Sequence, residues 1–164
     1  MKILLLSDNH GFVDDKILHH VKWADEVWHA GDWLNLDLHN QVMKLGKQIR
    51  GVHGNIDGTD VKHIYPLNNA FQIDGLKIFM THIGGKPSSY NPITKPVLLL
   101  HKPDLFICGH SHILMVKKDV KLNLLYMNPG ACGLHGFHTV RTALRFQIKN
   151  GKLESLEVIE WERG

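Results

Sequence analysis

Cysteine and long apolar runs are both scarce in this sequence. Only two of the 164 residues are cysteines, Cys108 and Cys132, and they lie far apart. Their scarcity argues against a disulfide-dense secreted scaffold and against a structural zinc site built from closely spaced cysteines. No stretch approaches the roughly 20 apolar residues of a membrane-spanning helix, so we expect no membrane partner. Cysteine usage of this kind suits the reducing cytosol, and we expect a cytoplasmic protein.

No linker, repeat or low-complexity stretch is visible in the sequence, and we expect no secretory signal. The apolar run over residues 2–6 is shorter than the apolar part of a secretory signal and leads directly into Asp8. We therefore interpret it as a core strand. A chain of 164 residues with 43% hydrophobic residues suits a single domain, residues 1–164, with a substantial core.

Positive charge is modest and dispersed. The formal net charge is +3, and Lys117-Lys118 is a pair in an expected hairpin, not part of a basic stripe. This pattern predicts a solvated surface, so nucleic acid is expected only as a substrate.

Polar residues of metal-binding types follow several short strands. Residues 2–7, 26–30, 76–80 and 105–108 are continuous apolar runs of the kind found in strands buried on both faces, and residues 48–52 form a fifth, shorter strand. The polar residues that follow these segments are Asp8, His10, Asp32, Asn55, His82, His110 and His112. Loops at the carboxyl ends of neighbouring strands converge on one crevice, so we expect these side chains to meet there.

The donor types indicate which metals suit the site. Imidazole nitrogens combined with carboxylate and amide oxygens favour a first-row divalent ion. Seven donors are too many for one closed tetrahedral shell, and they are enough for two ions.

The ordered motifs resemble a known family, the calcineurin-like metallophosphoesterases, and within it the small YfcE-type phosphodiesterases. The family pattern is D-x-H, G-D, G-N, H and G-H-x-H, and this chain has all five elements in that order. Asn128-Pro129-Gly130-Ala131 resembles a later turn of the family, and the resemblance extends to about residue 148. It implies an α/β fold in which two packed mixed β-sheets are flanked by α-helices, as four αββα layers.

The resemblance also implies a role for each site residue. Asp8, His10 and His112 would hold one ion, Asn55, His82 and His110 the other, and Asp32 would bridge both. The implied activity is phosphoester hydrolysis, with phosphodiesters as the expected substrates and a metal-bound hydroxide as the nucleophile. Manganese is the expected metal, with nickel, zinc, iron and cobalt as alternatives. A homo-oligomer is compatible with the sequence.

One position departs from the larger members of the superfamily. Those proteins have a histidine after G-N that protonates the leaving group, and this chain has Ile56 there. We expect a preference for good leaving groups, because a general acid contributes a factor of about 10²–10⁴. His53 is a candidate phosphate contact or proton donor, or an exposed loop histidine. Asp57 either orients a ligand imidazole or serves a turn or helix cap.

The other histidines receive no site role. His29 lies within an expected strand and is predicted to be buried and hydrogen-bonded. His135 and His138 lie in a glycine-rich loop and are left outside the site. The remaining five are predicted to be surface residues: His19, His20, His39, His63 and His101.

Helices and hairpins account for the rest of the chain. Apolar spacing predicts helices over residues 13–23 and 37–45, the second with Gly46 as its C-cap, and a third that includes residues 97–100 and ends before Pro103. Strands are predicted over residues 113–117, 122–127, 139–148 and 153–161, with Asn150-Gly151 as a two-residue hairpin turn.

A non-catalytic scaffold is the main alternative. The retromer subunit Vps29 resembles the same family and serves protein assembly with an eroded metal site. A scaffold has no need of seven donors of the correct types, so their presence favours an enzyme.

Overall fold

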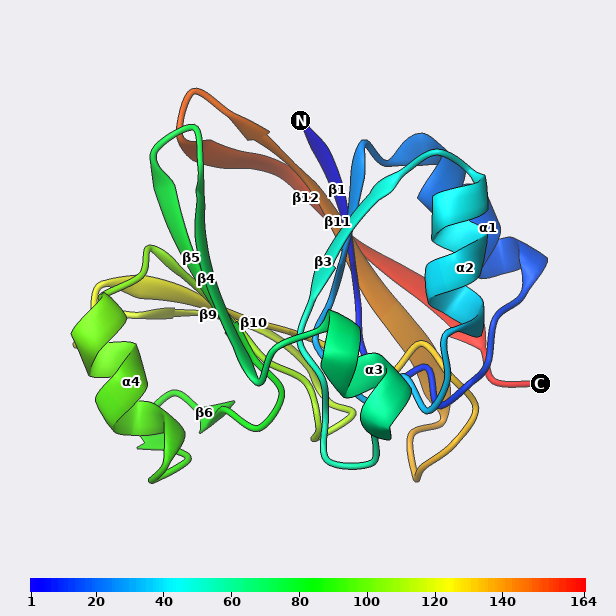
Figure 1. The fold of residues 1–164 in the computed structure, drawn as a ribbon. Coiled ribbons are helices and arrows are strands. Elements are labelled where there is room, and N and C mark those ends of the chain that lie inside the picture. The colour runs from blue at the N-terminus through cyan, green and yellow to red at the C-terminus, as the bar shows by residue number, and fades with distance from the viewer.

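Two five-stranded sheets face each other in the computed structural model, which describes residues 1–164 (Figure 1). The first sheet has the order β12-β11-β1-β2-β3, in which β1, β2 and β3 are parallel. Its strands are β1 (Lys2–Leu6), β2 (Glu26–His29), β3 (Gln48–Gly51), β11 (Val140–Lys149) and β12 (Lys152–Glu162). β11 runs antiparallel to both β1 and β12, so the sheet is mixed.

The second sheet has the order β4-β5-β8-β10-β9, with β5, β8 and β10 parallel and an antiparallel strand at each edge. Its strands are β4 (Asn68–Ile73), β5 (Leu76–Thr81), β8 (Leu105–Ile107), β9 (Leu114–Asp119) and β10 (Leu124–Pro129). A small separate hairpin is formed by β6 (Gly85–Lys86) and β7 (Ser89–Tyr90).

Helices cover the outer faces of the sheets. They are α1 (Asp15–Trp23), α2 (Asp37–Lys44), α3 (Thr59–Ile64) and α4 (Thr94–His101). In Figure 1, α1 and α2 lie outside the first sheet and α4 lies outside the second, while α3 lies near the lower end of β3. The predicted fold class, two packed mixed sheets flanked by helices, is confirmed.

The apolar run of β1 explains the layers. Ile3 and Leu5 belong to the buried cluster between the two sheets, together with residues such as Ile107 of the second sheet. Leu4 belongs to the cluster under the helices, with Ile17 of α1. Alternate side chains of a strand point to opposite faces, so a strand buried on both faces must be apolar at every position.

The boundaries of several elements differ slightly from the predictions. Helix α1 begins at Asp15 and not at residue 13, because the Asp14 side chain caps it by accepting the N–H of Ile17 at 2.9 Å. Strands β9 and β10 begin one and two residues later than predicted, and β11 and β12 each differ by one residue at both ends. The turn at Asn150-Gly151 is confirmed, since both residues have positive φ, 50° and 70°.

Three features were not predicted: α3, β4 and the β6–β7 hairpin. Helix α3 has only six residues, and β4 is an edge strand whose side chains are mostly exposed or half-buried. Neither carries an apolar repeat that the sequence alone would reveal. None of the helices has the length and hydropathy of a membrane span.

Candidate metal centre

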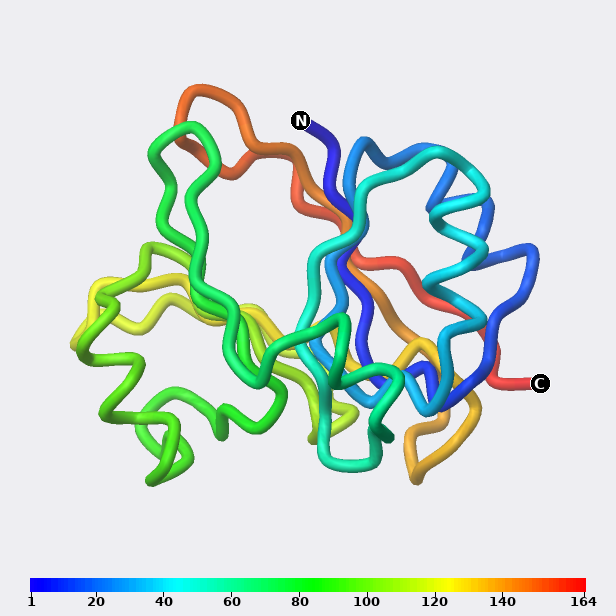
Figure 2. Tube along the Cα trace, in the orientation of Figure 1, coloured from blue at the N-terminus to red at the C-terminus, as the bar shows by residue number.

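The loops that follow β1, β2, β3 and β5 lie at the lower end of the molecule in Figure 2. Backbone hydrogen bonds join them: Asp8 N–H donates to Gly31 O at 2.9 Å, and His10 N–H donates to Asp32 O at 3.1 Å. Gly109, before the histidine pair, donates to His82 O at 3.0 Å. The loops therefore form one connected surface, as expected at the carboxyl ends of neighbouring strands.

Most of the predicted ligands have left-handed backbone conformations. The φ angles of Asp8, His10, Asp32, His110 and His112 are 53°, 45°, 60°, 68° and 58°. This conformation costs a residue with a Cβ about 1–2 kcal/mol, so the surrounding structure must hold it. Strained residues of this kind cluster at functional sites.

The glycines of the G-D and G-N motifs permit close packing of the loops. A Cβ on Gly54 would lie 2.0 Å from Asp32 Oδ1, and one on Gly31 would lie 2.6 Å from His82 Nδ1. Any side chain at either position would collide with a predicted ligand.

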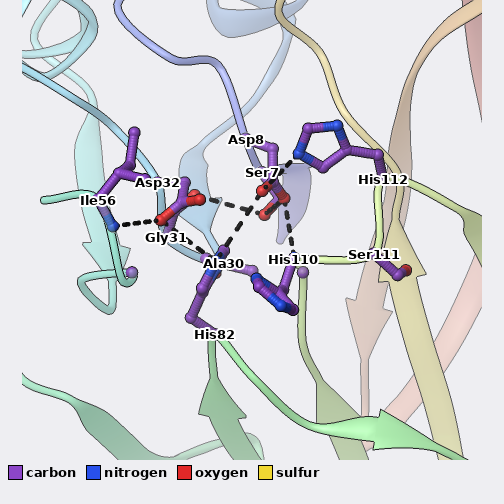
Figure 3. A network of polar contacts seen from close by, with 12 residues as sticks. Ser7, Asp8, Ala30, Gly31, Asp32, Ile56, His82, His110, Ser111 and His112 are labelled. Atoms are coloured by element: carbon purple, nitrogen blue, oxygen red, sulfur yellow. Dashed lines mark hydrogen bonds and ion pairs between the residues drawn. The ribbon is translucent and has the colours of Figure 1, made fainter. Parts of the chain in front are cut away.

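The first set of donors consists of Asp8, His10 and His112, whose potential ligand atoms all lie within 4.8 Å of one another. We call this set triad 1. His112 Nε2 lies 3.1 Å from Asp8 Oδ1, and His10 Nε2 lies 3.9 Å from the same oxygen. In Figure 3 the Asp8 carboxylate and the His112 ring point toward each other.

The second set consists of Asp32, His82 and His110, again within 4.8 Å of one another, and we call it triad 2. Asp32 Oδ1 lies 3.2 Å from His82 Nε2, and Asp32 Oδ2 lies 3.7 Å from His10 Nε2 of triad 1. The two oxygens of Asp32 thus face one histidine of each triad, which is compatible with the bridging role expected from the sequence.

Three potential ligand atoms are buried and have no hydrogen-bond partner: Asp8 Oδ1, His10 Nε2 and His82 Nε2. His82 Nε2 lies 4.0 Å from Asp8 Oδ1, so the unpartnered atoms converge. Burying polar atoms without partners is costly, and a cation at this point would satisfy them. The residues present therefore fit the divalent ions that the donor types suggest.

Asn55 is exposed and, together with His82, lines a cavity beside triad 2. No hydrogen bond ties its side chain to the triads. His53 is half-buried in the wall of the same cavity, with its Nδ1 3.3 Å from Gly54 O. Ile56 is 37% exposed, and its backbone N–H donates to Asp32 Oδ1 at 3.2 Å, as Figure 3 shows.

The acidic and basic groups of the triads shift one another's pKa values. Burial raises the pKa of Asp8, but His10, His112, His82 and Ser7 together lower it more, so this pKa lies well below the ordinary value. Burial likewise raises the pKa of Asp32, and His82 and the other groups around it bring it below the ordinary value. For His82, burial lowers the pKa and the Asp32 and Asp8 carboxylates raise it above the usual range. Both carboxylates are held in the anionic form that binds metals.

Neighbouring groups orient the ligands. His82 Nδ1 lies 2.7 Å from Ala30 O, and a carbonyl only accepts, so Nδ1 carries the proton and Nε2 is left free. Asp8 Oδ2 accepts from Ser7 Oγ at 2.5 Å and from the His110 backbone at 3.1 Å, which leaves Oδ1 for an ion.

Asp57 and Asn128 support the loops that carry the candidate ligands. The Asp57 carboxylate accepts four backbone N–H groups, from Asp32, Trp33, Leu34 and Gly54, at 2.7–3.0 Å. All four partners are backbone groups, so the suggestion that Asp57 orients a ligand imidazole is wrong. The suggested helix cap is wrong as well, because the N-cap of α3 is Gly58, and the turn role remains. Asn128 donates to Gly109 O at 2.8 Å and to Ser111 Oγ at 3.1 Å, which supports the loop that carries His110 and His112.

The predictions for the other histidines hold only in part. His29 is buried as predicted, with Nδ1 accepting the Gly31 N–H at 3.1 Å, although its Nε2 has no partner. His20 and His39 are half-buried, and His39 Nδ1 lies 2.6 Å from Tyr65 Oη, so they are not simple surface residues.

The two histidines of the glycine-rich loop lie closer to the site than predicted. The ring centroids of His135 and His10 are 4.7 Å apart, and those of His138 and His112 are 5.3 Å apart. The sequence offered one signal, since both follow the Asn128-Pro129-Gly130 turn.

Comparison with known proteins identifies the family. Residues 1–151 match the family model described as the calcineurin-like phosphoesterase superfamily domain. The chain belongs to that superfamily. A search of curated proteins found no match.

Solved structures of several relatives share the fold. Thermotoga maritima protein TM1076 is 26% identical, covers 98% of this chain and 99% of its own, and superposes with a TM-score of 0.72. An archaeal phosphodiesterase is 23% identical, covers 97% of this chain and 100% of its own, and has a TM-score of 0.71. Zinc-complexed Vps29 from Entamoeba histolytica is 16% identical, covers 100% of both chains, and has a TM-score of 0.75. The last two identities are low and establish the fold alone.

Proposed function

We propose that this superfamily member is a metal-dependent phosphodiesterase that uses two divalent ions. The observation that carries the proposal is the position of Asp32, whose two carboxylate oxygens lie 3.2 Å from His82 of triad 2 and 3.7 Å from His10 of triad 1. The archaeal phosphodiesterase with the same fold adds support. We further propose that residues 1–164 form one domain and that the protein acts in the cytoplasm.

Triad 1 would hold one ion and triad 2 the other, with Asn55 as a further ligand from the rim of the second site. Manganese is the metal we propose to test first, because mixed oxygen and imidazole donors suit it. When bound, a pair of divalent ions supplies Lewis acidity and lowers the pKa of water, which is the chemistry that hydrolysis of a phosphodiester requires.

Two buried side chains close to the site, Ser7 and Cys108, are not available as nucleophiles. The Ser7 hydroxyl is committed to Asp8 Oδ2, and Cys108 is fully buried, which raises the pKa of its thiol to about 12. We propose water as the attacking group, with the protein residues serving to hold ions, orient the phosphate and exclude competing groups.

The leaving group has no obvious proton donor. Ile56 occupies the position where larger members of the superfamily carry a general acid, and His53 is a candidate that lines the cavity beside triad 2. We propose that the enzyme prefers esters of acidic alcohols, which depart without protonation.

The test begins with metal-free protein loaded separately with Mn²⁺, Ni²⁺, Co²⁺, Zn²⁺ and Mg²⁺. Metal content is measured by mass spectrometry, and hydrolysis is compared for bis(4-nitrophenyl) phosphate and 4-nitrophenyl phosphate. We expect about two ions per chain and faster hydrolysis of the diester. Asp32→Asn should lose nearly all activity, whereas Asp60→Asn, at an exposed position in the first turn of α3, should keep it. One ion at most per loaded chain, or full activity of Asp32→Asn, contradicts the proposal.

A second candidate function is a protein-binding scaffold, in line with the structural similarity to Vps29. The observation that favours it is apolar exposure beside the ligands: Phe137 is 104% exposed, Ile113 61% and Leu34 55%. Folded protein that binds metal but hydrolyses none of the esters would support the scaffold over the enzyme.

A further inference from the structure

Two cavities of different size flank triad 2. The smaller, about 310 Å³, has His82 in its wall, and the larger, about 610 Å³, has His110 in its wall. The ring centroids of these two histidines are only 5.2 Å apart, and Figure 3 shows both rings beside the carboxylates. A phosphate held at triad 2 therefore has a separate cavity available for each of two ester groups.

The small cavity combines four apolar side chains with polar ones that include Lys62, Asn68 and Thr81. Leu67, Ile83, Ile93 and Val97 line it, and among them Leu67 is 58% and Ile93 84% exposed. Exposed apolar side chains beside a polar centre do not stabilise the core. A ligand that covers them removes apolar area from water, which favours its binding. Ligand pockets span about 300–1,000 Å³, so this cavity fits a compact group such as one aromatic ring.

The large cavity presents hydrogen-bond donors. Lys86, Ser89 and Ser111 lie in its wall, and neither Lys86 Nζ nor Ser89 Oγ has a partner in the protein. Ser111 Oγ already accepts from Ile113 N–H at 3.2 Å and from Asn128 Nδ2 at 3.1 Å, so its own hydrogen is free to donate. These donors suit a larger group rich in oxygen.

Asn91 lines both cavities. Its Oδ1 accepts the N–H groups of Ile93 at 2.9 Å and Thr94 at 3.3 Å at the start of α4, which fixes the orientation of the amide. Its Nδ2 has no acceptor in the protein, so it is a fixed donor in the wall common to both cavities.

We propose that the substrate is an unsymmetrical phosphodiester, with a compact apolar or aromatic ester group in the small cavity and a larger, sugar-like ester group in the large one. Asn91 Nδ2 acts between them as a specificity determinant that donates to the diester. The proposal rests on the proposed function, because it places phosphate at triad 2.

The activity test uses two diesters with the same leaving group, methyl 4-nitrophenyl phosphate and the 4-nitrophenyl ester of thymidine 5′-phosphate. We expect the nucleoside ester to have a KM about tenfold lower. Lys86→Ala should remove most of that advantage, while Lys95→Ala, which changes an exposed lysine of α4 outside both cavities, should not.

Ile93→Ala tests the small cavity. It should raise KM for both esters about fourfold or more, because apolar contact with the nitrophenyl ring is lost. Leu100→Ala, 79% exposed on α4, is its matched control.

Asn91→Ser tests the shared donor. Serine retains an oxygen that can accept at the start of α4 but has no amide. We expect KM for both diesters to rise about tenfold with kcat little changed, since a hydrogen bond to an anion is lost. An unchanged melting temperature would separate this result from a structural defect.

A binding measurement keeps the two proposals distinguishable. Phenylphosphonate and methylphosphonate, which have no ester bond to hydrolyse, are titrated into Mn²⁺-loaded protein by calorimetry. We expect phenylphosphonate to bind about tenfold more tightly, and Ile93→Ala to reduce that ratio while Leu100→Ala preserves it. If the wild type hydrolyses diesters but Ile93→Ala and Lys86→Ala behave as their controls, the two-cavity assignment is wrong and the proposed function stands. If no diester is hydrolysed, the proposed function fails. Equal binding of the two phosphonates would then overturn the small-cavity assignment as well.

Discussion

The Asp57 carboxylate accepts the backbone N–H of Asp32, the candidate bridging residue, at 3.0 Å. The same carboxylate binds Gly54 N–H at 2.7 Å, and Gly54 directly precedes Asn55. One buried side chain thus fixes the G-D loop and the G-N loop relative to each other, although the two lie more than twenty residues apart in sequence.

Replacing Asp57 should therefore destabilise the metal-free protein. Asp57→Ala leaves four backbone donors without their acceptor, and we expect a loss of at least about 3 kcal/mol in the free energy of unfolding. Urea unfolding measures this loss. Asp60→Ala, at an exposed position three residues later, should change stability by less than about 0.5 kcal/mol. Equal stabilities of the two variants would show that the Asp57 hydrogen bonds contribute little.

Loss of a triad 1 ligand should lower the metal content. His112→Ala removes the imidazole whose Nε2 lies 3.1 Å from Asp8 Oδ1, and we expect bound Mn²⁺ to fall from about two ions per chain toward one. An ion that binds only the folded state stabilises it by about 2.7 kcal/mol at a hundred times its Kd. Mn²⁺ should therefore raise the melting temperature of His112→Ala less than that of the wild type. His63→Ala, which removes an exposed histidine outside both triads, is the control. A content of two ions in His112→Ala would remove this residue from the ligand set.

The missing general acid predicts a steep dependence of rate on leaving-group pKa. A series of aryl methyl phosphodiesters measures that slope in the wild type, and Ile56→His should accelerate the poor leaving groups more than the good ones. Ile56 is 37% exposed, so the substitution should be tolerated.

A flat dependence in the wild type would contradict this expectation and would show that a proton donor is already present or that another step limits the rate. His53→Ala then decides between these cases. A slope that becomes steep in this variant identifies His53 as the donor, and a slope that stays flat assigns control to another group or step.

Acid should destabilise the metal-free protein through His29. Burial lowers the pKa of His29 to about 3, whereas the unfolded chain takes up this proton near the ordinary value of 6.5. The stability that depends on neutral His29 is thus complete above pH 6.5 and is lost as the pH falls toward 3. The expected slope from this residue alone is about 1.4 kcal/mol per pH unit.

Urea unfolding at pH 7.5, 6.0 and 5.0 measures the slope. His29→Phe keeps a ring that can stack on Trp33, which lies 3.7 Å from the histidine ring, and it cannot take up a proton. We expect this variant to be less stable at pH 7.5, because the Gly31 N–H loses its acceptor, but less sensitive to acid. An identical slope in both proteins would mean that His29 does not carry the effect.

Local sequence was sufficient for much of the fold. The apolar runs of β1, β2, β5 and β8 predicted buried strands because every position of such a strand faces a core, as Ile3 and Leu4 do on opposite faces. The Asn150-Gly151 turn was likewise predictable, since both residues tolerate positive φ. Helix α3 and strand β4 were missed because a six-residue helix and an exposed edge strand have no periodic apolar pattern.

The sequence by itself determined the chemical types of the donors and their order along the chain, since these are properties of single residues and short motifs. The family resemblance implied how the donors group, but only the tertiary structure decided how closely they approach one another. It also decided that Asp57 binds the backbone of Asp32, that His135 approaches His10, and that two unequal cavities meet beside triad 2. These relationships join residues far apart in the chain. Their distances are set by how the two sheets pack and where each loop turns, and no local pattern of residues encodes that packing.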